Sequence, residues 1–474
     1  MNKQMKVLLV VFLVCLTGVV VNLIWVQIFG ADKIQGNSYN KRRLVEEYAI
    51  QRGDIISGDR QVLARSVDSG TEYRWRREYP LGSLFADITG YDSWRYGRAG
   101  LEAAFNKELL GKGPDTLRSL TSRMLESSKK GDSLVLTVDS NLQRTASEAL
   151  GDRKGAVVAL DPKTGAILAM VTSPTFDPNI AVPQKDLEAQ AQQWDALNTN
   201  PNQPLFNRPT SGLYPPGSAF KVVVAGAALE TGIVTPDSVY DCAGELLVHG
   251  YTIYDFARKT HGELTFSQAL VVSCNITFAQ VGLKLGASRF THYAEAFGWN
   301  KPIPFDLPTE PSKTQNPSSM DPVQLASASF GQGQDLATPL QMAQVAATVA
   351  NDGAVMRPYL VDQIQDYNGK IIEQFGAKRL NQAISKETAD TLTEMMVKVV
   401  DGGTGTAAQL DGVSVAGKTG TAEVEGQDPH AWFICFAPAN DPRIALAVLV
   451  EHGGEGGRTA APIAREVLME ALGL

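Results

Sequence analysis

The sequence predicts an α+β fold, an antiparallel sheet flanked by helices with an all-helical lobe set into it. Two apolar runs, 155–161 and 166–173, are separated by a turn containing Pro and Gly, as in a hairpin at the covered centre of a sheet. Three more strand-like runs follow one another within 413–453. The intervening stretch 219–400 is mainly helical in pattern, and a helix from Thr459 ends the chain. The two groups of strands are therefore expected to form one sheet around a helical insertion.

An apolar segment without a charged residue, 7–31, precedes this domain. As a helix it is about 37 Å long, which exceeds the ~30 Å hydrocarbon core of a bilayer. It predicts a transmembrane anchor, so residues 1–31 form a cytoplasmic stub and a single membrane span. A cleaved signal peptide is the alternative, although its apolar core is usually about half as long. Lys3 and Lys6 precede the span, which places the N-terminus in the cytoplasm and the chain from residue 32 outside the cell membrane.

Residues 32–150 mix short β-like runs with Gly-containing turns. They contain no cluster of ionisable groups suited to catalysis, which predicts a β-rich structural pedestal. The run 74–77, Arg-Trp-Arg-Arg, is a candidate contact patch, but a solvated strand face is the simpler interpretation. The catalytic domain is expected to occupy residues 151–474.

The composition limits the function classes. The chain has 474 residues, of which 44% are hydrophobic and 20% charged, so it is large enough for two globular domains. A net charge of −8 argues against a nucleic acid as partner. The four cysteines, at positions 15, 242, 274 and 435, fit neither a dense disulfide framework nor a paired metal motif. A bridge between Cys242 and Cys274 remains open at this stage.

A reactive pair is predicted at the start of a buried helix. Pro215, Pro216 and Gly217 interrupt regular structure, and the Ala-rich run after them predicts a helix that starts at Ser218. Lys221 lies three positions further on, so its amine and the Ser218 hydroxyl share one face of the first turn. The unpaired N–H groups and the positive end of the helix dipole lie beside them. A weak nucleophile thus has a neighbouring base.

Two further motifs follow this pair in order. A Ser-Cys-Asn motif occupies 273–275, and Lys-Thr-Gly occupies 418–420 inside the alternating, strand-like run 413–424. The same spacings recur elsewhere, but in contexts that favour loops and turns: Ser127 with Lys130, Ser38 with Asn40, and Lys163 with Gly165.

The ordered motifs S-x-x-K, S-x-N and K-T-G are typical of penicillin-binding proteins and related serine enzymes. The chain resembles a class B penicillin-binding protein of the shorter, actinobacterial or clostridial type, and the resemblance extends to NRPTSGLYPPGSAFKV, FGQGQDLATPLQMA, HAWFICFAP, RGDIISGDRQVLA and GRAGLEAAFNKELLG. It implies the penicillin-binding transpeptidase fold, shared with serine β-lactamases, after a dimerisation-like pedestal. One departure, Ser57-Gly58 where a Tyr is common, affects local loop shape only.

The resemblance implies a peptidoglycan D,D-transpeptidase that forms an acyl-enzyme on Ser218, with Lys221 as the base. Lys221 can accept a proton only if its pKa is lowered by burial and by a second cation, which Lys418 supplies. At ~6 Å and an effective dielectric of ~20, one positive charge contributes roughly 2.8 kcal/mol, or about two pKa units. The Ser273 hydroxyl would relay a proton between the lysines and the leaving group, and Asn275 would hold a substrate amide.

The resemblance also places substrate binding along the strand of the third motif. Thr419 and Thr421, with Lys418, would bind the terminal carboxylate of the substrate, and Gly420 would let a peptide backbone approach. The backbone N–H groups of Ser218 and Thr421 would form the oxyanion hole. The donor stem peptide would end in D-Ala-D-Ala and release D-Ala, and β-lactam antibiotics would acylate the same serine. No metal or cofactor is implied.

Three alternatives remain open from the sequence. A β-lactamase shares the motifs, but the E-x-x-L-N loop of class A enzymes does not occur in the sequence. A D,D-carboxypeptidase would pass the acyl group to water. A non-catalytic wall scaffold or β-lactam sensor would not need all three motifs intact. The sequence also leaves open whether the enzyme serves elongation, division or sporulation.

A partner is expected because the pedestal is too short for the glycosyltransferase domain of class A relatives. The chain therefore does not polymerise glycan strands, and a polytopic glycosyltransferase of the SEDS family is the expected partner. Thr17, Gly18 and Asn22 in the span are small or polar and favour helix packing in a membrane, although a lone helix in lipid is the alternative.

Overall fold

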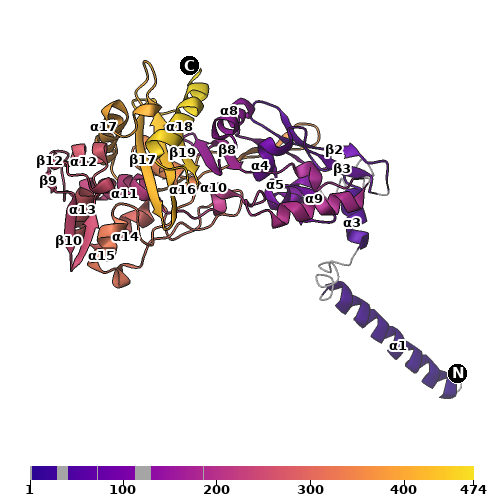
Figure 1. The fold of residues 1–474 in the computed structure, drawn as a ribbon. Coiled ribbons are helices and arrows are strands. Elements are labelled where there is room, and N and C mark those ends of the chain that lie inside the picture. Colours follow the sequence, from indigo (N-terminus) through magenta and orange to yellow (C-terminus); the bar gives the residue numbers. More distant parts are fainter. Residues whose placement is uncertain (1–2, 29–40, 72, 113–129, 185) are drawn as a thin grey trace.

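The computed structural model describes residues 3–28, 41–71, 73–112, 130–184 and 186–474 (Figure 1). The end of the predicted span, 29–31, and the alternative motif positions 38–40 and 127 lie outside these residues. Helix α1, Lys3–Ile28, is the predicted N-terminal apolar helix. Its part Lys3–Leu23 has a mean hydropathy of 2.5 and is long and apolar enough to cross a membrane.

The pedestal is built around a six-stranded sheet with the strand order β15-β14-β6-β1-β2-β3. Four strands come from the N-terminal region: β1 (Ile55–Ile56), β2 (Val62–Asp68), β3 (Trp75–Glu78) and β6 (Ser133–Leu136). The other two, β14 (Val361–Gln365) and β15 (Ile371–Gln374), return from far downstream, and β14 pairs antiparallel with β6. The pedestal sheet thus includes a late segment, although the sequence predicts that this segment belongs to the catalytic domain.

The N-terminal region also contains short helices and one two-stranded ribbon: α3 (Lys41–Tyr48), α4 (Ala86–Thr89), β4 (Asp92–Ser93), β5 (Gly97–Arg98), α5 (Gly100–Ala104) and α6 (Asn106–Leu109). The run 74–77 falls largely within β3, where Arg77 is buried and Arg76 is exposed. The alternation fits a strand with one buried face. One arginine of the run is therefore a core residue of the pedestal.

The second sheet is five-stranded and antiparallel throughout, in the order β17-β18-β19-β7-β8. Its strands are β7 (Gly155–Leu160), β8 (Ile167–Ser173), β17 (Ala416–Val424), β18 (Gln427–Ala437) and β19 (Ile444–Val450). The early hairpin and the three late strands therefore do form one sheet, as predicted. Strand β17, which carries the Lys-Thr-Gly motif, lies at its edge.

Helices cover both faces of this sheet (Figure 1). Alternate residues of each strand point to opposite cores: Val158 and Ile434 belong to one, Val157 and Phe433 to the other. The second core is covered by α8 (Ser140–Leu150) and α18 (Gly456–Leu472). The first core contains α11 (Lys221–Glu230) and α16 (Pro339–Ala350).

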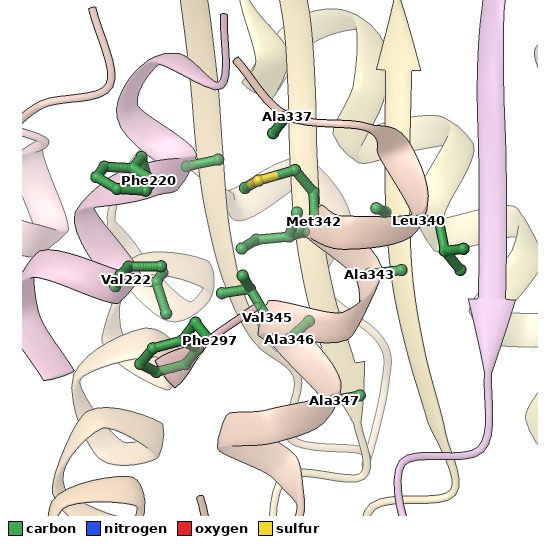
Figure 2. Packing of buried hydrophobic residues seen from close by; sticks show 14 of the residues in the cluster. Phe220, Val222, Phe297, Ala337, Leu340, Met342, Ala343, Val345, Ala346 and Ala347 are labelled. Atoms are coloured by element: carbon green, nitrogen blue, oxygen red, sulfur yellow. The ribbon is translucent and has the colours of Figure 1, made fainter. Parts of the chain in front are cut away.

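Helix α16 fills the space between the sheet and α11. Figure 2 shows Met342 and Val345 of α16 on the side that faces Phe220, Val222 and Phe297. The helix begins as predicted, with Thr338 accepting a hydrogen bond from the N–H of Gln341 and with Pro339 at the first helical position. Such a buried, close-packed helix gives the catalytic region a rigid base.

The inserted lobe contains helices α12 (Phe266–Val272), α13 (Asn275–Leu285), α14 (Ala287–Ala296) and α15 (Pro322–Ala328), and α17 (Lys386–Gly402) follows later. The prediction of an all-helical lobe is wrong in one respect, because the lobe also carries β9 (Val239–Cys242), β10 (Glu245–Val248), β11 (Tyr251–Tyr254) and β12 (Gly262–Thr265). These strands form two-stranded ribbons, β12 with β9 and β10 with β11, at the end of the molecule away from the pedestal (Figure 1). Strand β9 alternates exposed and buried residues, which is the period of a strand and not of a helix.

Further strands within 219–400, β13 (Ala354–Met356) and β16 (Arg379–Gln382), form another ribbon. Two helix starts also differ from the prediction. The nucleophile segment Gly217–Phe220 is a 3-10 turn, and regular α-helix begins at Lys221. Helix α18 begins at Gly456 and not at Thr459.

Candidate active site

The predicted nucleophile lies in a turn that is fixed from two sides. Gly217 has a φ of +52°, and a Cβ there would lie 2.8 Å from the carbonyl oxygen of Thr421, so only glycine fits. Its N–H donates to the carbonyl of Gly331 at 3.0 Å. The indole Nε1 of Trp432 donates to the carbonyl of Pro215 at 2.9 Å. Ser218 is therefore held against strand β17, and it is only half-buried.

Lys221 begins helix α11 and is completely buried. In a 3-10 turn residues three apart lie on the same side, so the changed helix type is compatible with the predicted proximity of Ser218 and Lys221. The Lys221 Nζ donates to the carbonyl of Ser273 at 2.6 Å and to Oδ1 of Asn275 at 2.7 Å, and it lies 3.2 Å from Oγ of Ser273. The first and second motifs are thus in direct contact.

Lys418 contacts Ser273 from the side of the sheet. It lies in the middle of β17, opposite Ile434 of β18, and is completely buried. Its Nζ donates to Oγ of Ser273 at 2.9 Å and to the carbonyl of Thr419 at 2.9 Å. The Ser273 hydroxyl therefore lies between the two lysines, which is the geometry needed for the predicted proton relay.

Ser273 owes its position to a strained junction between two helices. It has a φ of +63°, in the left-handed region, and ends α12. The next residue, Cys274, caps α13 through its sulfur, and Asn275 is the first residue of that helix. The break between α12 and α13 turns Ser273 and Asn275 toward Lys221 together.

The pKa of both lysines is lowered. Burial is the main cause for Lys221, the charge of Lys418 adds to it, and Asp255 partly offsets them. Burial also lowers the pKa of Lys418, to about 7. Burial and the charge of Lys418 are the two causes that the sequence predicts for Lys221. The lowered pKa favours the neutral amine of Lys221, which is the form that a general base requires.

Thr419, Gly420 and the following Thr421 contact other parts of the chain. The Oγ1 of Thr419 is 2.6 Å from Oγ1 of Thr404, and Thr419 is 6% exposed. Gly420 is needed because a Cβ there would lie 3.0 Å from the carbonyl of Pro216 and 2.8 Å from Cβ of Trp432. It thus lets the nucleophile turn approach the strand. Thr421 is half-buried and its carbonyl contacts Gly217.

A polar cluster behind the second motif escaped the sequence analysis. Asp255 is 4% exposed, and its Oδ1 accepts the N–H of Asn275 at 2.8 Å. Its Oδ2 lies 3.1 Å from Nδ1 of His261. Cys274 forms a disulfide with Cys242, which the sequence had left open. The cluster braces the loop that carries Ser273.

These four side chains, Cys242, Asp255, His261 and Cys274, also have potential metal-ligand atoms within 4.8 Å of one another. A disulfide sulfur is not a thiolate, and thiolates are the form in which cysteines bind metals. The disulfide-bonded form described here therefore does not present a set of four ligands. No regular spacing in the sequence marks Asp255 or His261 as neighbours of the motif.

The chain matches two protein-family models and several known proteins. Residues 155–469 match the family model for the penicillin binding protein transpeptidase domain, and residues 52–134 match that for the penicillin binding protein A dimerisation domain. Peptidoglycan D,D-transpeptidase PbpA from Mycolicibacterium smegmatis is 37% identical over 100% of this chain and 99% of its own length. The protein of the same name from Mycobacterium tuberculosis is 36% identical, with 100% and 99% covered.

Solved structures are similar over the same extent. Penicillin-binding protein A from M. tuberculosis, as a penicillin G acyl-enzyme complex, has a TM-score of 0.84 at 37% identity, with 90% of this chain and 100% of that chain covered. The D,D-transpeptidase domain of a peptidoglycan glycosyltransferase from Eggerthella lenta has a TM-score of 0.80 at 37% identity, with 90% and 99% covered.

Proposed function

The chain belongs to the penicillin-binding protein transpeptidase family, and we infer that it is a peptidoglycan D,D-transpeptidase that cross-links stem peptides in bacterial cell-wall synthesis and is acylated by penicillins. The observation that carries this function is the Ser273 hydroxyl, 3.2 Å from Nζ of Lys221 and 2.9 Å from Nζ of Lys418. One hydroxyl links the candidate base to the second cation. That link supports acyl transfer, in which a proton must pass from nucleophile to leaving group.

In the first half-reaction Oγ of Ser218 attacks the carbonyl between the two terminal D-Ala residues, and neutral Lys221 accepts its proton. The tetrahedral oxyanion would be held by the backbone N–H groups of Ser218 and Thr421. The proton then passes through the Ser273 hydroxyl to the departing amine. The peptide bond breaks, D-Ala leaves, and an ester on Ser218 remains.

In the second half-reaction an amine of a neighbouring stem peptide attacks the ester. The amine gives up a proton to Lys221, a new peptide bond forms, and the Ser218 oxygen leaves with a proton returned by Lys221. Asn275, whose side chain accepts from Lys221, and Thr421 at the edge strand would orient the donor peptide. Lys418 and Thr419 would meet its terminal carboxylate, for which the hydroxyl of Thr419 must exchange its contact with Thr404.

The test is intact-mass analysis after reaction with penicillin. We expect one covalent adduct on the wild-type protein and none on Ser218→Ala. Ser211→Ala removes a half-buried hydroxyl from helix α10, Arg208–Ser211, and should keep the adduct. An adduct that survives Ser218→Ala, or no adduct on folded wild-type protein, would contradict the assignment.

The same protein, given a D-Ala-D-Ala donor and an amine acceptor, separates transpeptidation from hydrolysis. A transpeptidase yields the cross-linked product together with D-Ala. A D,D-carboxypeptidase yields the shortened acid instead, and a scaffold or sensor yields no product. Rapid release of hydrolysed penicillin would indicate a β-lactamase.

We further propose that α1 anchors the enzyme in the cell membrane with the N-terminus in the cytoplasm and the catalytic domain outside. The support is the apolar length of Lys3–Leu23 and the two lysines at its N-terminal end, Lys3 and Lys6. A cysteine introduced after residue 32 should react with a membrane-impermeant thiol reagent in intact cells, whereas one introduced before Lys3 should not. The opposite pattern would reverse this orientation.

A SEDS-family glycosyltransferase is the proposed partner in the membrane, because a transpeptidase needs newly made glycan strands near its site. The small and polar residues Thr17, Gly18 and Asn22 of α1 support helix packing. Replacing residues 7–31 with an unrelated span of equal length should weaken co-purification with the polymerase and leave penicillin acylation intact. Unchanged co-purification of a variant that lacks both the native span and residues 32–150 would rule the arrangement out.

A further inference from the structure

Two threonine hydroxyls meet at the strand that carries the third motif. The Oγ1 of Thr404 lies 2.6 Å from the Oγ1 of Thr419, the second residue of Lys-Thr-Gly. Thr419 is only 6% exposed, whereas Thr404 is an exposed residue, so Thr404 is the member of the pair that solvent reaches. Among the described residues, the Thr404 hydroxyl has no other hydrogen-bond partner. The three motifs do not include Thr404, and the proposed reaction gives it no contact with the substrate.

The neighbours of Thr419 in strand β17 place this pair next to the reacting groups. On one side, the Nζ of Lys418 donates to Oγ of Ser273 at 2.9 Å. On the other side, Gly420 packs against the nucleophile turn, because a Cβ there would lie 3.2 Å from the backbone nitrogen of Ala219, the residue after the nucleophile. Consecutive Cα atoms are ~3.8 Å apart, so Thr419 is one residue away from both contacts. The hydroxyl pair therefore lies at the edge of the candidate active site.

Three helices hold the backbone around Thr404. The N–H of Gly403 donates to the carbonyl of Val399, near the end of α17, at 3.1 Å. A Cβ at Gly403 would lie 2.7 Å from the carbonyl oxygen of Val271 in α12. A Cβ at Gly457 in α18 would lie 2.4 Å from the carbonyl oxygen of Thr404. This close packing fixes the loop before a ligand arrives, so binding does not have to order it.

The surroundings of the hydroxyl pair favour a negatively charged ligand. Helix α18 is 17 residues long and begins next to the pair, since a Cβ at Gly457 would also lie 3.5 Å from Cγ2 of Thr419. The positive end of a helix dipole stabilises a nearby anion. Glu455, the residue before α18, pairs with Arg458 at 3.4 Å, which offsets its charge. The Nζ of Lys418, 2.9 Å from the carbonyl of Thr419, adds positive charge when it is protonated.

The substrate of the proposed reaction carries such a ligand. The donor peptide ends in a free carboxylate one residue beyond the carbonyl that Ser218 attacks, and penicillins carry a carboxylate on the ring fused to their reactive amide. We propose that Thr404 is a further substrate-binding residue, whose hydroxyl donates a hydrogen bond to this carboxylate together with the hydroxyl of Thr419. The contact between the two hydroxyls is then exchanged for contacts with the two carboxylate oxygens. This inference rests on the transpeptidase function proposed above and adds a residue to its site.

The experiment compares the acylation rate constants for penicillin G and for its methyl ester, in which the carboxylate is blocked. The wild type should prefer the acid. Thr404→Val keeps the shape of the side chain but removes the hydroxyl, and it should lower the acid-to-ester ratio by about tenfold, as expected for one hydrogen bond to a charged group. Its rate with the ester should not change, which also shows that the variant is folded.

Two controls accompany this variant. Thr404→Ser keeps the hydroxyl and should keep the ratio. Thr406→Val removes an exposed hydroxyl two residues further along the same loop, and it should also keep the ratio. Thr404→Ala is a second variant without the hydroxyl, and its ratio decides if Thr404→Val is not folded.

A double variant separates a direct contact of Thr404 from an effect through Thr419. Thr419→Val should itself lower the ratio. If both hydroxyls contact the carboxylate, adding Thr404→Val should lower the ratio further. If Thr404 only orients Thr419, the second substitution has no additional effect.

Four results would overturn the assignment of Thr404 and leave the transpeptidase function standing: an unchanged ratio without the Thr404 hydroxyl, an equal fall of the rates with acid and ester, an equal fall of the ratio in Thr406→Val, or no further fall in the double variant. A folded wild-type protein that forms no adduct with penicillin G would overturn the function and this inference together.

Discussion

Buried charge is handled in opposite ways in the pedestal and at the candidate active site. In the pedestal Arg52 and Arg77 flank Glu102, with nitrogen to oxygen distances of 2.7 and 2.5 Å, and all three side chains are at most 5% exposed. At the active site Lys221 and Lys418 are equally buried, but their hydrogen-bond partners are carbonyls, a hydroxyl and an amide. The pedestal neutralises its charges with ion pairs, whereas the active site does not.

The pKa values follow this difference. Burial lowers the pKa of Arg52, but Glu102 and Asp92 outweigh burial and raise it. Burial raises the pKa of Asp92, but Arg52 and Arg98 outweigh burial and lower it. Asp92 therefore stays ionised beside these arginines. At the two lysines burial is not outweighed by an acid: Asp255 offsets it only partly at Lys221, whose pKa stays well below its usual value, and the pKa of Lys418 falls to about 7. Ion pairing keeps the groups of the pedestal charged, whereas its absence favours a neutral lysine amine at the candidate active site.

The largest effect that tests this comparison is expected for Lys221→Arg. The substitution keeps a positive charge but removes a group that can be neutral, since the guanidinium stays protonated. Penicillin acylation should fall by about 10³-fold or more, within the range known for general bases. Stopped-flow acylation with a fluorescent penicillin measures it.

Lys418→Arg is the matched control, because Lys418 is expected to act as a cation and not as the base. Its loss should be clearly smaller. Comparable acylation rates for the two variants would show that the division of roles between the lysines is wrong.

Glu102→Gln in the pedestal should give the next largest effect, but on stability. It leaves Arg52 and Arg77 buried without their shared carboxylate, and the free energy of unfolding should fall by about 3–5 kcal/mol. Denaturant unfolding measures the loss, and the acylation rate of the folded fraction should not change.

Glu78→Gln is the control for this prediction. It breaks the Arg65–Glu78 pair, whose side chains are 51% and 34% exposed, and it should cost less than about 1 kcal/mol. Equal losses for Glu78→Gln and Glu102→Gln would contradict the view that burial sets the value of these pairs.

The sequence predicted those parts of the structure that local pattern decides. The strands of the five-stranded sheet, the cap at Thr338 and the three motifs were all visible as short runs with the right period or spacing. The contact between the motifs was expected from resemblance, because spacing along the chain says nothing about residues as far apart as Ser273 and Lys418.

What the sequence missed depends on long-range contacts. Strand β14 completes the pedestal sheet by pairing with β6, and no local signal marks that partner. Asp255 follows β11 and reaches Asn275 because β9 and β11 pack against α13. The nucleophile segment is a 3-10 turn because Gly217 adopts a positive φ against Thr421, a contact with another part of the chain. In each case tertiary packing overrides local propensity.

A gain in stability, smaller than the loss expected for Glu102→Gln, is expected when an active-site charge is removed. Lys418 has a pKa of about 7 in the fold against 10.5 for an ordinary lysine, so between these values the unfolded chain binds more protons than the folded protein. Stability should therefore rise with pH from about 7 toward 10, and below pH 7 the full cost of a buried charge remains. Lys418→Met removes that cost and should raise the free energy of unfolding by about 1–4 kcal/mol at pH 6, with the gain shrinking toward pH 10. Asp92 in the pedestal predicts the opposite pH dependence of stability. Its pKa is lowered in the fold, so its contribution to stability is present above its unfolded pKa and is lost as the pH falls through its folded pKa. Urea titrations of the wild type and Lys418→Met at pH 6, 8 and 10 measure the difference, and a Lys418→Met variant that is less stable than the wild type at pH 6 would show that the active-site charge is compensated after all.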